Sequence, residues 1–490
     1  MFKKMLIANR GEIAVRVIQT CREMGIATAA LYAPQEARSL HVAYADEAIP
    51  FSGSFSDPAA ILAAAQACGA DAIHPGYGFL AEESDFIRVC TAAGIAFIGP
   101  SADLLDRVHD KVETLAFVRA NGFRTVESLR PAFDEDAESI AESAAQLGYP
   151  VVVKSCYGGR GPGERLARDP ERLREAVRSA LAESRAVFGK EAIYLEKAIL
   201  PANQVGVQIL ADRHGNLIHL GDREGSLQHN NGKLIEEAPA PCLSPEGRAE
   251  LLDSALALAR LLGLENAATL EFLIDDAGRF YFTEVKARIQ TEHALTEMIT
   301  GVDLVREQIR IAAGDPLSLR QAEVRFRGHA VMCRIHAQDP LNRMRSSPGQ
   351  LQEVRLPVGA GLRVDTYVQS GCNVPGTYAS LVAKLTAWGG SREQAVARLG
   401  RALEDLTLTG VPTNIPFLQS LLRDEAFAVG RYSIETGYRH HADIPEDDAY
   451  LQAVAVAAAL LYAGRGQPAG AVVPDRLQSG WHRSSRRLPQ

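Results

Sequence analysis

The first hundred residues alternate short, continuously apolar runs with longer segments in which apolar residues recur every three or four positions. The short runs have the length of buried strands, and the longer segments have the spacing of helices with one apolar face. We predict strands at 5–8, 27–32, 72–74 and 94–100, and helices at 12–24, 58–68 and 101–111. Because elements that alternate in this way form open, mostly parallel sheets, residues 1–110 are predicted to be an α/β domain.

The remaining chain changes its pattern, and we predict a linker at 111–124, a small unit at 125–200, a large domain at 201–445 and a tail at 446–490. The small unit contains strands at 149–154 and 193–197. Strand patterns are frequent in the large domain, which indicates α+β architecture, so the whole chain is predicted to be α/β and α+β. The tail is rich in Gly, Pro, Ser and Arg and is expected to be partly disordered, with a packed helix at 451–464.

The most informative strand pattern lies in the large domain. Apolar and polar residues alternate over 269–274 and again over 279–285, and residues 275–278 have turn chemistry. This pattern predicts an antiparallel hairpin. A turn centred on residues 276 and 277 places Glu271 opposite Phe282, with Glu284 as a diagonal neighbour on the same face.

The predicted hairpin face is unusually polar. Its period of two continues beyond Glu284 through Lys286, Arg288 and Gln290, and Glu292 follows. Carboxylates on a sheet face, together with cations, are suited to Mg2+ and substrate phosphates. Isolated charges of this kind are more often a solvated face with surface ion pairs. The flanking phenylalanines at 272, 280 and 282 place the strands inside a domain and favour a site.

A glycine-rich segment supplies a candidate phosphate contact. Lys154 ends an apolar strand and precedes four glycines, at positions 158, 159, 161 and 163. Glycines let backbone N–H groups approach phosphate oxygens closely, so the segment resembles a phosphate-covering flap, although it has no Walker spacing. A flexible loop is the ordinary alternative. Lys111 could reach the same phosphates, although a lone lysine is usually solvated.

Several other polar residues are candidates with structural alternatives. Glu196 and Lys197 could contact a purine edge or form only an ion pair at a strand end. Arg334, at the end of a predicted strand, could bind a carboxylate or stabilise an enolate, or could belong to a buried ion pair. Gln228, Lys233, His74 and Tyr77 are further candidates, each of which could be structural.

Composition narrows the functional classes. The 490 residues are 47% hydrophobic and 23% charged, which is ordinary for globular domains, and the formal net charge of -8 without a long basic tract argues against nucleic acid. No segment has the length and apolarity of a membrane span, and the N-terminus does not resemble a signal peptide. The 7 cysteines have no CxxC spacing, which argues against a zinc ribbon or disulfide framework and favours a reducing cytoplasm.

Seven motifs occur in the order found in one enzyme family. They are IANRGEIAVRV, HPGYGFLAE, EEAPAP, RIQTEH, TEMITGVDL, RGHAVMCRI and SPGQL. Over residues 1–438 the chain resembles the biotin carboxylases of the ATP-grasp superfamily. The resemblance implies an N-terminal open parallel sheet, a small lid domain and a C-terminal α+β domain. It also implies a ligase in which ATP phosphorylates bicarbonate to carboxyphosphate, which releases CO2 for transfer to the ureido nitrogen of biotin.

The resemblance also implies roles for individual residues. The nucleotide contacts would be Lys111, Lys154, Gly158, Gly159, Glu196, Lys197, Gln228 and Leu273, and the Mg2+ or Mn2+ ligands would be Glu271 and Glu284. The bicarbonate and biotin pocket would contain Tyr77, Lys233, Arg288, Gln290, Thr291, Glu292 and Arg334. In that pocket Glu292 would be the general base, and Arg334 would stabilise the biotin enolate.

Some positions depart from the family pattern. Lys286 stands where the family's metal site has an asparagine. Its ammonium would attract the nearby carboxylates and repel divalent ions, so we expect weaker binding of at least one Mg2+. The other departures are Tyr157 and Pro162 in the flap, Gln204, Gly206, Asn231, Ala379, Gln19 in the family's dimer contact, and the milder changes Thr291 and His336.

The expected partners follow from the resemblance and from the distribution of lysine. No lysine follows Lys384 and no Met-Lys pair occurs, so we expect biotin to arrive in trans on a biotin carboxyl carrier protein. A carboxyltransferase is the second implied partner, and a homodimer is compatible with the resemblance. Two alternatives stay open: an ATP-grasp ligase with a different acceptor, and a catalytically impaired regulatory paralogue.

Overall fold

A computed structural model describes residues 1–130, 137–156, 165–188, 193–229, 232–436 and residue 456. The N-terminal part is a five-stranded sheet of order β3-β2-β1-β4-β5, and all four strand pairs are parallel. Its strands are β1 (Lys4–Ile7), β2 (Ala27–Tyr32), β3 (Glu47–Pro50), β4 (Ala72–His74) and β5 (Ala96–Phe97). The predicted parallel α/β architecture is therefore confirmed.

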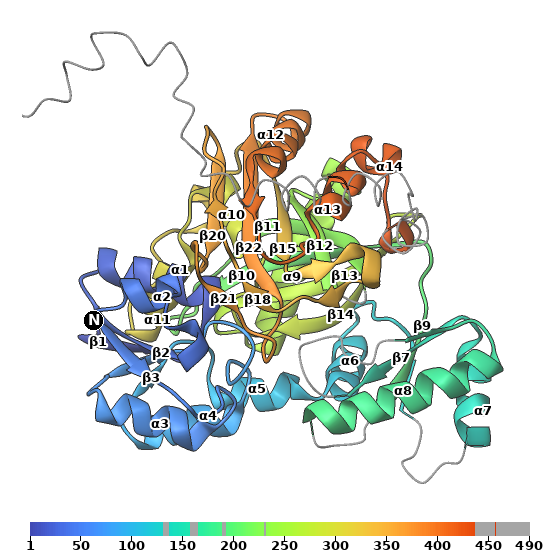
Figure 1. Cartoon of the computed structure of the whole chain (residues 1–490). Coiled ribbons are helices and arrows are strands. Elements are labelled where there is room, and N and C mark those ends of the chain that lie inside the picture. The colour runs from blue at the N-terminus through green and yellow to red at the C-terminus, as the bar shows by residue number, and fades with distance from the viewer. Residues whose placement is uncertain (131–136, 157–164, 189–192, 230–231, 437–455, 457–490) are drawn as a thin grey trace, which may run out of the picture. The chain divides into compact units, whose positions relative to one another are not determined.

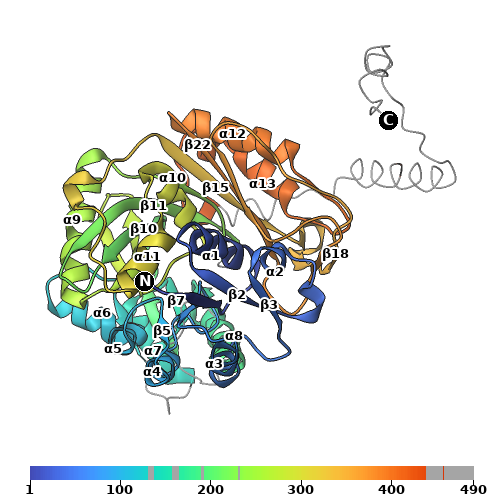
Figure 2. The same ribbon diagram turned by 90° about the vertical axis from the view of Figure 1, so that its left-hand side faces the viewer.

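Helices cover both faces of this sheet (Figures 1 and 2). They are α1 (Gly11–Glu23), α2 (Leu40–Tyr44), α3 (Pro58–Ala67) and α4 (Ser84–Ala92), with a short 3-10 helix, η1 (Pro34–Glu36). The continuously apolar strands make this possible, because alternate residues of β1 enter different cores: Met5 and Ile7 pack with α1, whereas Leu6 packs with α3 and α4.

A second, four-stranded antiparallel sheet has the order β6-β9-β7-β8. It contains β6 (Ser128–Leu129), β7 (Val151–Ser155), β8 (Arg165–Ala167) and β9 (Ile193–Lys197), and it packs against α7 (Ala137–Leu147) and α8 (Pro170–Phe188). The segment before it was expected to be one helix at 101–111. The helix that forms there is α5 (Ala102–His109), and the segment expected to be a linker at 111–124 begins with a second helix, α6 (Lys111–Ala120). Asp110 separates the two helices and caps the second by accepting from the N–H groups of Val112 and Glu113.

The largest sheet has eight strands in the order β14-β13-β10-β11-β12-β15-β22-β20, and all its pairs are antiparallel. The strands are β10 (Ala202–Ala211), β11 (Leu217–His229), β12 (Gly232–Ala238), β13 (Asn266–Asp275), β14 (Phe280–Lys286), β15 (His329–His336), β20 (Leu362–Thr366) and β22 (Leu381–Gly389). The helices around it are α9 (Pro245–Leu262), α10 (His293–Thr300), α11 (Leu304–Ala312) and α12 (Arg392–Asp405). This sheet carries most of the candidate site.

Shorter elements complete the described chain. They are β16 (Gln338–Asp339), β17 (Arg345–Ser346), β18 (Gly349–Gln350), β19 (Val354–Arg355), β21 (Asn373–Val374), β23 (Thr407–Leu408), α13 (Ile415–Leu422), α14 (Glu425–Ala428), η2 (Gln321–Glu323) and η3 (Pro340–Asn342). All seven cysteines are free thiols. Among the described residues, none of the helices has both the length and the apolar character needed to cross a bilayer.

The hairpin of β13 and β14 forms as predicted, but its register is different. The loop has three residues rather than two, with Gly278 at φ 76°, and Phe272 therefore lies opposite Phe282. An extra residue in β14, at Thr283, then makes a bulge, so Glu271 lies directly opposite Glu284 rather than opposite Phe282. The two carboxylates share one face more closely than the sequence alone predicts.

Some predictions fall outside the described residues. These are the flap with Tyr157, Gly158, Gly159 and Pro162, the replacement at Asn231, the tail at 446–490, and the helix expected at 451–464 apart from residue 456.

Candidate active site

Glu292 lies at the centre of the candidate site. It is the N-cap residue of α10, but its side chain makes no capping hydrogen bond. Instead, Lys233 Nζ donates to Oε1 over 2.7 Å and Arg334 Nη2 donates to Oε2 over 3.0 Å. Burial by itself raises the pKa of Glu292, but Lys233, Arg334 and Arg223 outweigh burial and hold that pKa well below its ordinary value. Glu292 is therefore a carboxylate at neutral pH.

A second buried acid, Glu236, orients Arg334. Arg334 Nε and Nη2 each donate to one carboxylate oxygen of Glu236, both over 2.9 Å, which is a bidentate pair. Lys233 Nζ lies 3.8 Å from the same carboxylate. A side chain at Gly225 would come within 2.8 Å of Lys233 Cε, so glycine at that position leaves room for the lysine. The site thus contains two cations between two acids.

Glu271 is held by neutral amides as well as by Lys233. Its Oε1 accepts from Gln290 Nε2 over 2.7 Å and from Lys233 Nζ over 3.5 Å, and its Oε2 accepts from Gln204 Nε2 over 3.2 Å. The amide oxygen of Gln290 accepts from the buried Arg223 over 2.7 Å, which fixes the direction in which Gln290 donates. The carboxylate of Glu271 is therefore rigidly placed beside Lys233.

Glu284, opposite Glu271, is bound by two ammonium groups. Lys111 Nζ lies 3.1 Å from its Oε2 and Lys286 Nζ lies 2.8 Å from the same atom. Burial raises the pKa of Glu284, but Lys111, Lys286 and Lys154 reverse this effect and lower the pKa far below its ordinary value. Burial lowers the pKa of Lys286, and Glu284 opposes that shift.

These carboxylates fit a nucleotide-bound Mg2+ better than a protein-bound metal cluster. No three His, Cys, Asp or Glu side chains within the described part of the chain are grouped to hold a metal ion. Glu271 and Glu284 can supply one or two carboxylates to an ion that also binds phosphates. Each additional unit of positive charge near the two ammonium groups costs on the order of 4 kcal/mol at about 4 Å in a surface-like dielectric. The charge balance therefore opposes a second divalent ion.

Arg288 contacts a residue that the sequence did not single out. Its Nε donates to Glu82 over 2.8 Å, and Nη1 donates to the backbone carbonyl of Ile289 over 3.2 Å. Glu82, in the HPGYGFLAE motif, follows β4 of the N-terminal sheet, and Arg288 follows β14 of the largest sheet. This ion pair therefore joins the N-terminal part to the hairpin segment and sets the direction of the guanidinium.

If Arg288 binds bicarbonate, as the family resemblance implies, replacing Glu82 is expected to affect bicarbonate binding more than turnover. In Glu82→Gln the guanidinium of Arg288 loses its charged partner, and we expect the KM for bicarbonate to rise by about tenfold, a value reduced for the partial exposure of the pair. Steady-state phosphate release over a bicarbonate titration measures this change. The exposed Glu83→Gln is the matched neighbour control, and an unchanged KM in Glu82→Gln contradicts the positioning role.

The proposed biotin end brings together residues from both ends of the described chain. The Tyr77 hydroxyl contacts Glu12 Oε1, and Lys384 Nζ lies 3.5 Å from the same oxygen. Lys384 Nζ also donates to the backbone carbonyl of Thr291 over 3.1 Å. Lys384 is fully buried, so it fixes the peptide that precedes Glu292.

Among the residues expected to contact the nucleotide, the ion pair that forms is not the Glu196–Lys197 pair considered from the sequence. Lys154 Nζ lies 2.8 Å from Glu196 Oε2, and the Tyr194 hydroxyl donates to Glu196 Oε1 over 2.9 Å. Lys197 instead donates to the backbone carbonyl of Gly148 over 2.6 Å. Glu196 and Lys197 therefore do not pair with each other: Glu196 contacts side chains of β7 and β9, whereas Lys197 contacts the loop that precedes β7.

Gln204 links the nucleotide end to Glu271. It lies opposite Leu273 across β10 and β13, and its amide oxygen accepts from Gln228 Nε2. Gln228 also donates to the backbone carbonyl of Gly225 over 2.8 Å. The predicted neighbours Leu273 and Gln228 therefore lie on two sides of Gln204, whose Nε2 reaches Glu271.

Glu224, a buried acid close to Gln204, predicts that the stability of the protein depends on pH. Glu224 is fully buried, accepts from Asn203 Nδ2 over 3.2 Å, and contacts the hydroxyl of Ser226 and the thiol of Cys242. Burial raises its pKa to about 7, against the hydrogen bonds that lower it. Because the folded protein holds this proton and the unfolded chain releases it near pH 4.5, stability falls as the pH rises from about 4.5 to about 7.

A substitution that removes the ionisable carboxyl of Glu224 is expected to remove this fall in stability with rising pH. We expect Glu224→Gln to be more stable than wild type above pH 7, by about 2–3 kcal/mol, and to differ less at pH 5. Urea denaturation at pH 5 and pH 8 measures the effect. An equal change at both pH values contradicts the buried, protonated state of Glu224.

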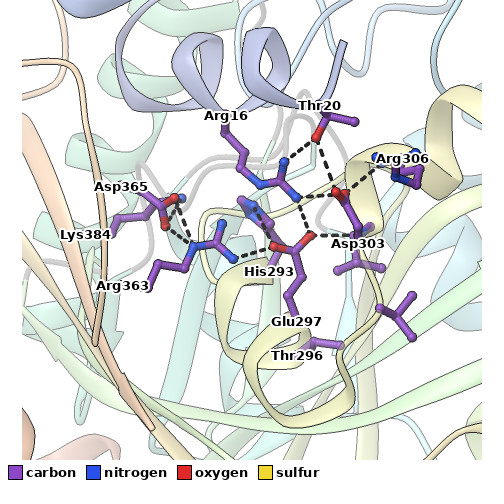
Figure 3. Close-up of polar contacts among 12 residues, drawn as sticks. Arg16, Thr20, His293, Thr296, Glu297, Asp303, Arg306, Arg363, Asp365 and Lys384 are labelled. Carbon is purple, nitrogen blue, oxygen red and sulfur yellow. Dashed lines mark hydrogen bonds and ion pairs between the residues drawn. The ribbon is translucent and has the colours of Figure 1, made fainter. Parts of the chain in front are cut away.

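A buried network of charges holds α10, which begins directly after Glu292 (Figure 3). Glu297 on α10 lies between two arginines: Arg16 Nη2 is 3.0 Å from Oε1, and Arg363 Nη1 is 2.5 Å from Oε2. Arg16 also pairs with Asp303 at 2.7 Å, and Arg363 pairs with Asp365 at 3.0 Å. The network connects α1, α10, β20 and the start of α11, and so fixes the helix that carries the Glu292 backbone.

Sequence reasoning missed four side chains in this site. Glu236 lies in the EEAPAP motif and Glu82 in the HPGYGFLAE motif, but the sequence did not predict a contact for either. Arg223 is buried next to Gln290, and Glu12 contacts Tyr77. The available signal was a charged residue in an otherwise buried strand or motif, because such a residue is buried only with a partner.

Comparison with known proteins covers nearly the whole described chain. Residues 1–105 match the family "Biotin carboxylase, N-terminal domain", residues 110–320 match "Carbamoyl-phosphate synthase L chain, ATP binding domain", and residues 332–437 match "Biotin carboxylase C-terminal domain". Biotin carboxylase of Pseudomonas aeruginosa is 42% identical over 439 residues, which is 89% of this chain and 97% of that protein.

Solved structures give the same result for the fold. The biotin carboxylase domain dimer of Hydrogenobacter thermophilus 2-oxoglutarate carboxylase, a complex with MgADP, ADP and bicarbonate, is 40% identical, has a TM-score of 0.87, and matches 91% of this chain and 100% of that chain. Pyruvate carboxylase of Rhizobium etli is 36% identical, has a TM-score of 0.85, and matches 91% of this chain and 41% of that chain. The fold is thus the ATP-grasp fold predicted from the sequence. The chain belongs to the biotin carboxylase family.

Proposed function

We propose that this chain carboxylates biotin on a separate carrier protein, with ATP and bicarbonate as substrates and carboxyphosphate as the intermediate. As a member of the biotin carboxylase family it is an ATP-dependent ligase. The observation that carries the proposal is the Glu292 carboxylate, which is kept ionised between Lys233 and Arg334. The bound MgADP and bicarbonate of the Hydrogenobacter relative support the same substrates here.

The first step joins bicarbonate to the terminal phosphoryl group of ATP. Bicarbonate binds beside Lys233 and Arg288, and Glu292 accepts its proton. The resulting oxyanion attacks the γ-phosphorus, the bond to the β-γ bridging oxygen breaks, and ADP leaves. A carboxylate with a lowered pKa is a weak base, so the transfer depends on the positive charge around it, which also stabilises the doubly charged nucleophile.

The second step transfers carbon dioxide to biotin. Carboxyphosphate breaks its C–O bond to give CO2 and phosphate. The phosphate takes the proton from the ureido nitrogen, which attacks the carbon of CO2 to form carboxybiotin. Arg334 stabilises the oxyanion that develops on the ureido oxygen, because its guanidinium is fixed by Glu236 before the reaction begins.

The nucleotide is proposed to bind between the four-stranded sheet, which carries Lys154 and Glu196, and the eight-stranded sheet, which carries Leu273. Lys111 and Lys154 contact its phosphates, and Glu196, Lys197, Leu273 and Gln228 surround its base and ribose. Glu271 and Glu284, which lie opposite one another in the β13-β14 pair, would hold the Mg2+ that arrives with ATP, and that ion would neutralise phosphate charge. Gly158 and Gly159 are proposed to cover the phosphates.

The assembly around the enzyme is also a proposal. A biotin carboxyl carrier protein would deliver biotin and a carboxyltransferase would use the carboxybiotin. A homodimer is supported by the Hydrogenobacter relative, which is described as a dimer. The matched relatives include a pyruvate carboxylase and a 2-oxoglutarate carboxylase, so the choice of final acceptor is assigned to the carboxyltransferase partner.

The proposed function is tested by following phosphate and carbon together. The protein is incubated with MgATP and 14C-bicarbonate, with and without free biotin, and phosphate release and labelled carboxybiotin are measured. Bicarbonate-dependent phosphate release that rises with biotin and yields labelled carboxybiotin is expected. Turnover with label in another product would overturn biotin as the acceptor, and a folded protein without turnover would leave the regulatory paralogue as the explanation.

A further inference from the structure

Three lysines approach Glu284, one of the two carboxylates at which the nucleotide's metal ion is proposed to bind. Lys286 Nζ and Lys111 Nζ both contact Glu284 Oε2, at 2.8 Å and 3.1 Å. Lys154 is close enough to lower the pKa of Glu284 as well. The Lys286 side chain is 9% exposed and that of Lys111 is 12% exposed, so both lysines are largely shielded from solvent beside the carboxylate.

The backbone places Lys286 there, rather than a chance side-chain conformation. Thr269 and Lys286 are opposite one another in the β13-β14 pair, two residues along the same face from Glu271 and Glu284. The bulge at Thr283 sets this register. Lys286 is the last residue of β14. Because it lies two residues beyond Glu284, its side chain is on the same face of the sheet as the Glu284 carboxylate.

A divalent ion and this ammonium compete for the same oxygen. Mg2+ binds carboxylate oxygens in near-octahedral geometry at about 2.0–2.1 Å and keeps several water ligands, which requires room around the oxygen. Glu284 Oε2 already has two cationic neighbours. Glu271 instead accepts from two neutral amides and from one lysine at 3.5 Å, so a metal ion meets less competing positive charge there than at Glu284.

We propose that the Lys286 ammonium is a tethered cation that replaces one divalent metal ion beside the nucleotide phosphates. The chain then binds a single divalent ion, the one that arrives with ATP. This inference rests on the proposed ATP-dependent function. It makes Lys286 a phosphate-neutralising residue of this chain and predicts a different metal stoichiometry from that of a variant with a neutral side chain at this position.

Metal binding with a non-hydrolysable nucleotide tests the inference without turnover. Mn2+ is titrated into protein saturated with β,γ-imido-ATP, and free Mn2+ is measured by electron paramagnetic resonance. Wild type is expected to bind one Mn2+ per chain. Lys286→Asn, which removes the charge and supplies an oxygen ligand, is expected to bind two, because the affinity for the second ion rises by about 100-fold or more.

Two further variants serve as controls. Lys286→Arg keeps the charge and is expected to bind one Mn2+, and Lys3→Asn makes the same substitution at an exposed lysine and is also expected to bind one. Two Mn2+ per chain in wild type would overturn the inference, as would one in a folded Lys286→Asn. If Lys286→Asn does not fold, the wild-type and Lys286→Arg stoichiometries decide the question.

The proposed function and this inference fail in different ways. Binding of radiolabelled β,γ-imido-ATP, measured by equilibrium dialysis, reports whether the protein takes a nucleotide at all. Absence of nucleotide binding would refute the proposed function, whereas nucleotide binding with two Mn2+ ions would refute only the tethered cation.

Discussion

Glu292→Gln is expected to lower bicarbonate-dependent phosphate release by about 100-fold to 10,000-fold, the range for loss of a general base. The amide keeps the shape of the side chain but cannot accept the bicarbonate proton, and it leaves Lys233 and Arg334 without a shared counter-charge. Nucleotide binding is expected to change much less, because Lys111 and Lys154 are bound to other acids. The measurement is the initial rate of phosphate release at saturating ATP and bicarbonate.

The control for this substitution is Glu250→Gln, on the exposed face of α9. It makes the same chemical change away from the site and is expected to retain the wild-type rate. Circular dichroism of both variants separates loss of chemistry from loss of structure. A folded Glu292→Gln that keeps more than about one tenth of the wild-type rate is incompatible with its role as the base.

Glu297→Ala is expected to destabilise the protein by about 3 kcal/mol, the lower end of the range for breaking a buried ion pair. The substitution leaves two buried arginines, Arg16 and Arg363, without the acid between them, and it removes the acceptor for the Leu304 N–H at 2.8 Å. Each arginine keeps another acid, Asp303 or Asp365, which limits the loss. A lower urea midpoint of the first unfolding transition measures it.

The network in Figure 3 also predicts that the loss of stability in Glu297→Ala affects the candidate site. Because α10 begins immediately after Glu292, a loosened helix is expected to reduce turnover together with stability. Glu250→Ala is the matched control for loss of an exposed glutamate. Wild-type urea resistance in Glu297→Ala would mean that Asp303 and Asp365 suffice to hold both arginines.

The parallel α/β start of the chain was predictable because its signals are local. Strands β2 and β4 have the predicted bounds, as does β9 in the small antiparallel sheet, because each is a short apolar run with a local signal. The site was harder to predict. The residues were found through motifs, but the pairs they form, such as Arg288 with Glu82 and Arg334 with Glu236, join segments that are far apart in the sequence.

The hairpin illustrates the same limit at one position. The alternation of apolar and polar residues identified both strands. Because of the three-residue loop and the bulge at Thr283, however, Glu271 lies opposite Glu284 rather than opposite the predicted Phe282. A one-residue change in loop length, or a bulge, hardly alters the alternation of apolar and polar residues in the sequence. It does change which side chains lie opposite one another.

By itself, the sequence determined the class of fold, the family resemblance and the types of charged residue, because strand and helix periodicity and ordered motifs are properties of neighbouring residues. The tertiary structure alone decided which cation meets which carboxylate: Lys233 and Arg334 at Glu292, and Lys111 and Lys286 at Glu284. The physical reason is that a buried charge is stable only with a partner, and the partner is chosen by packing among strands distant in the chain.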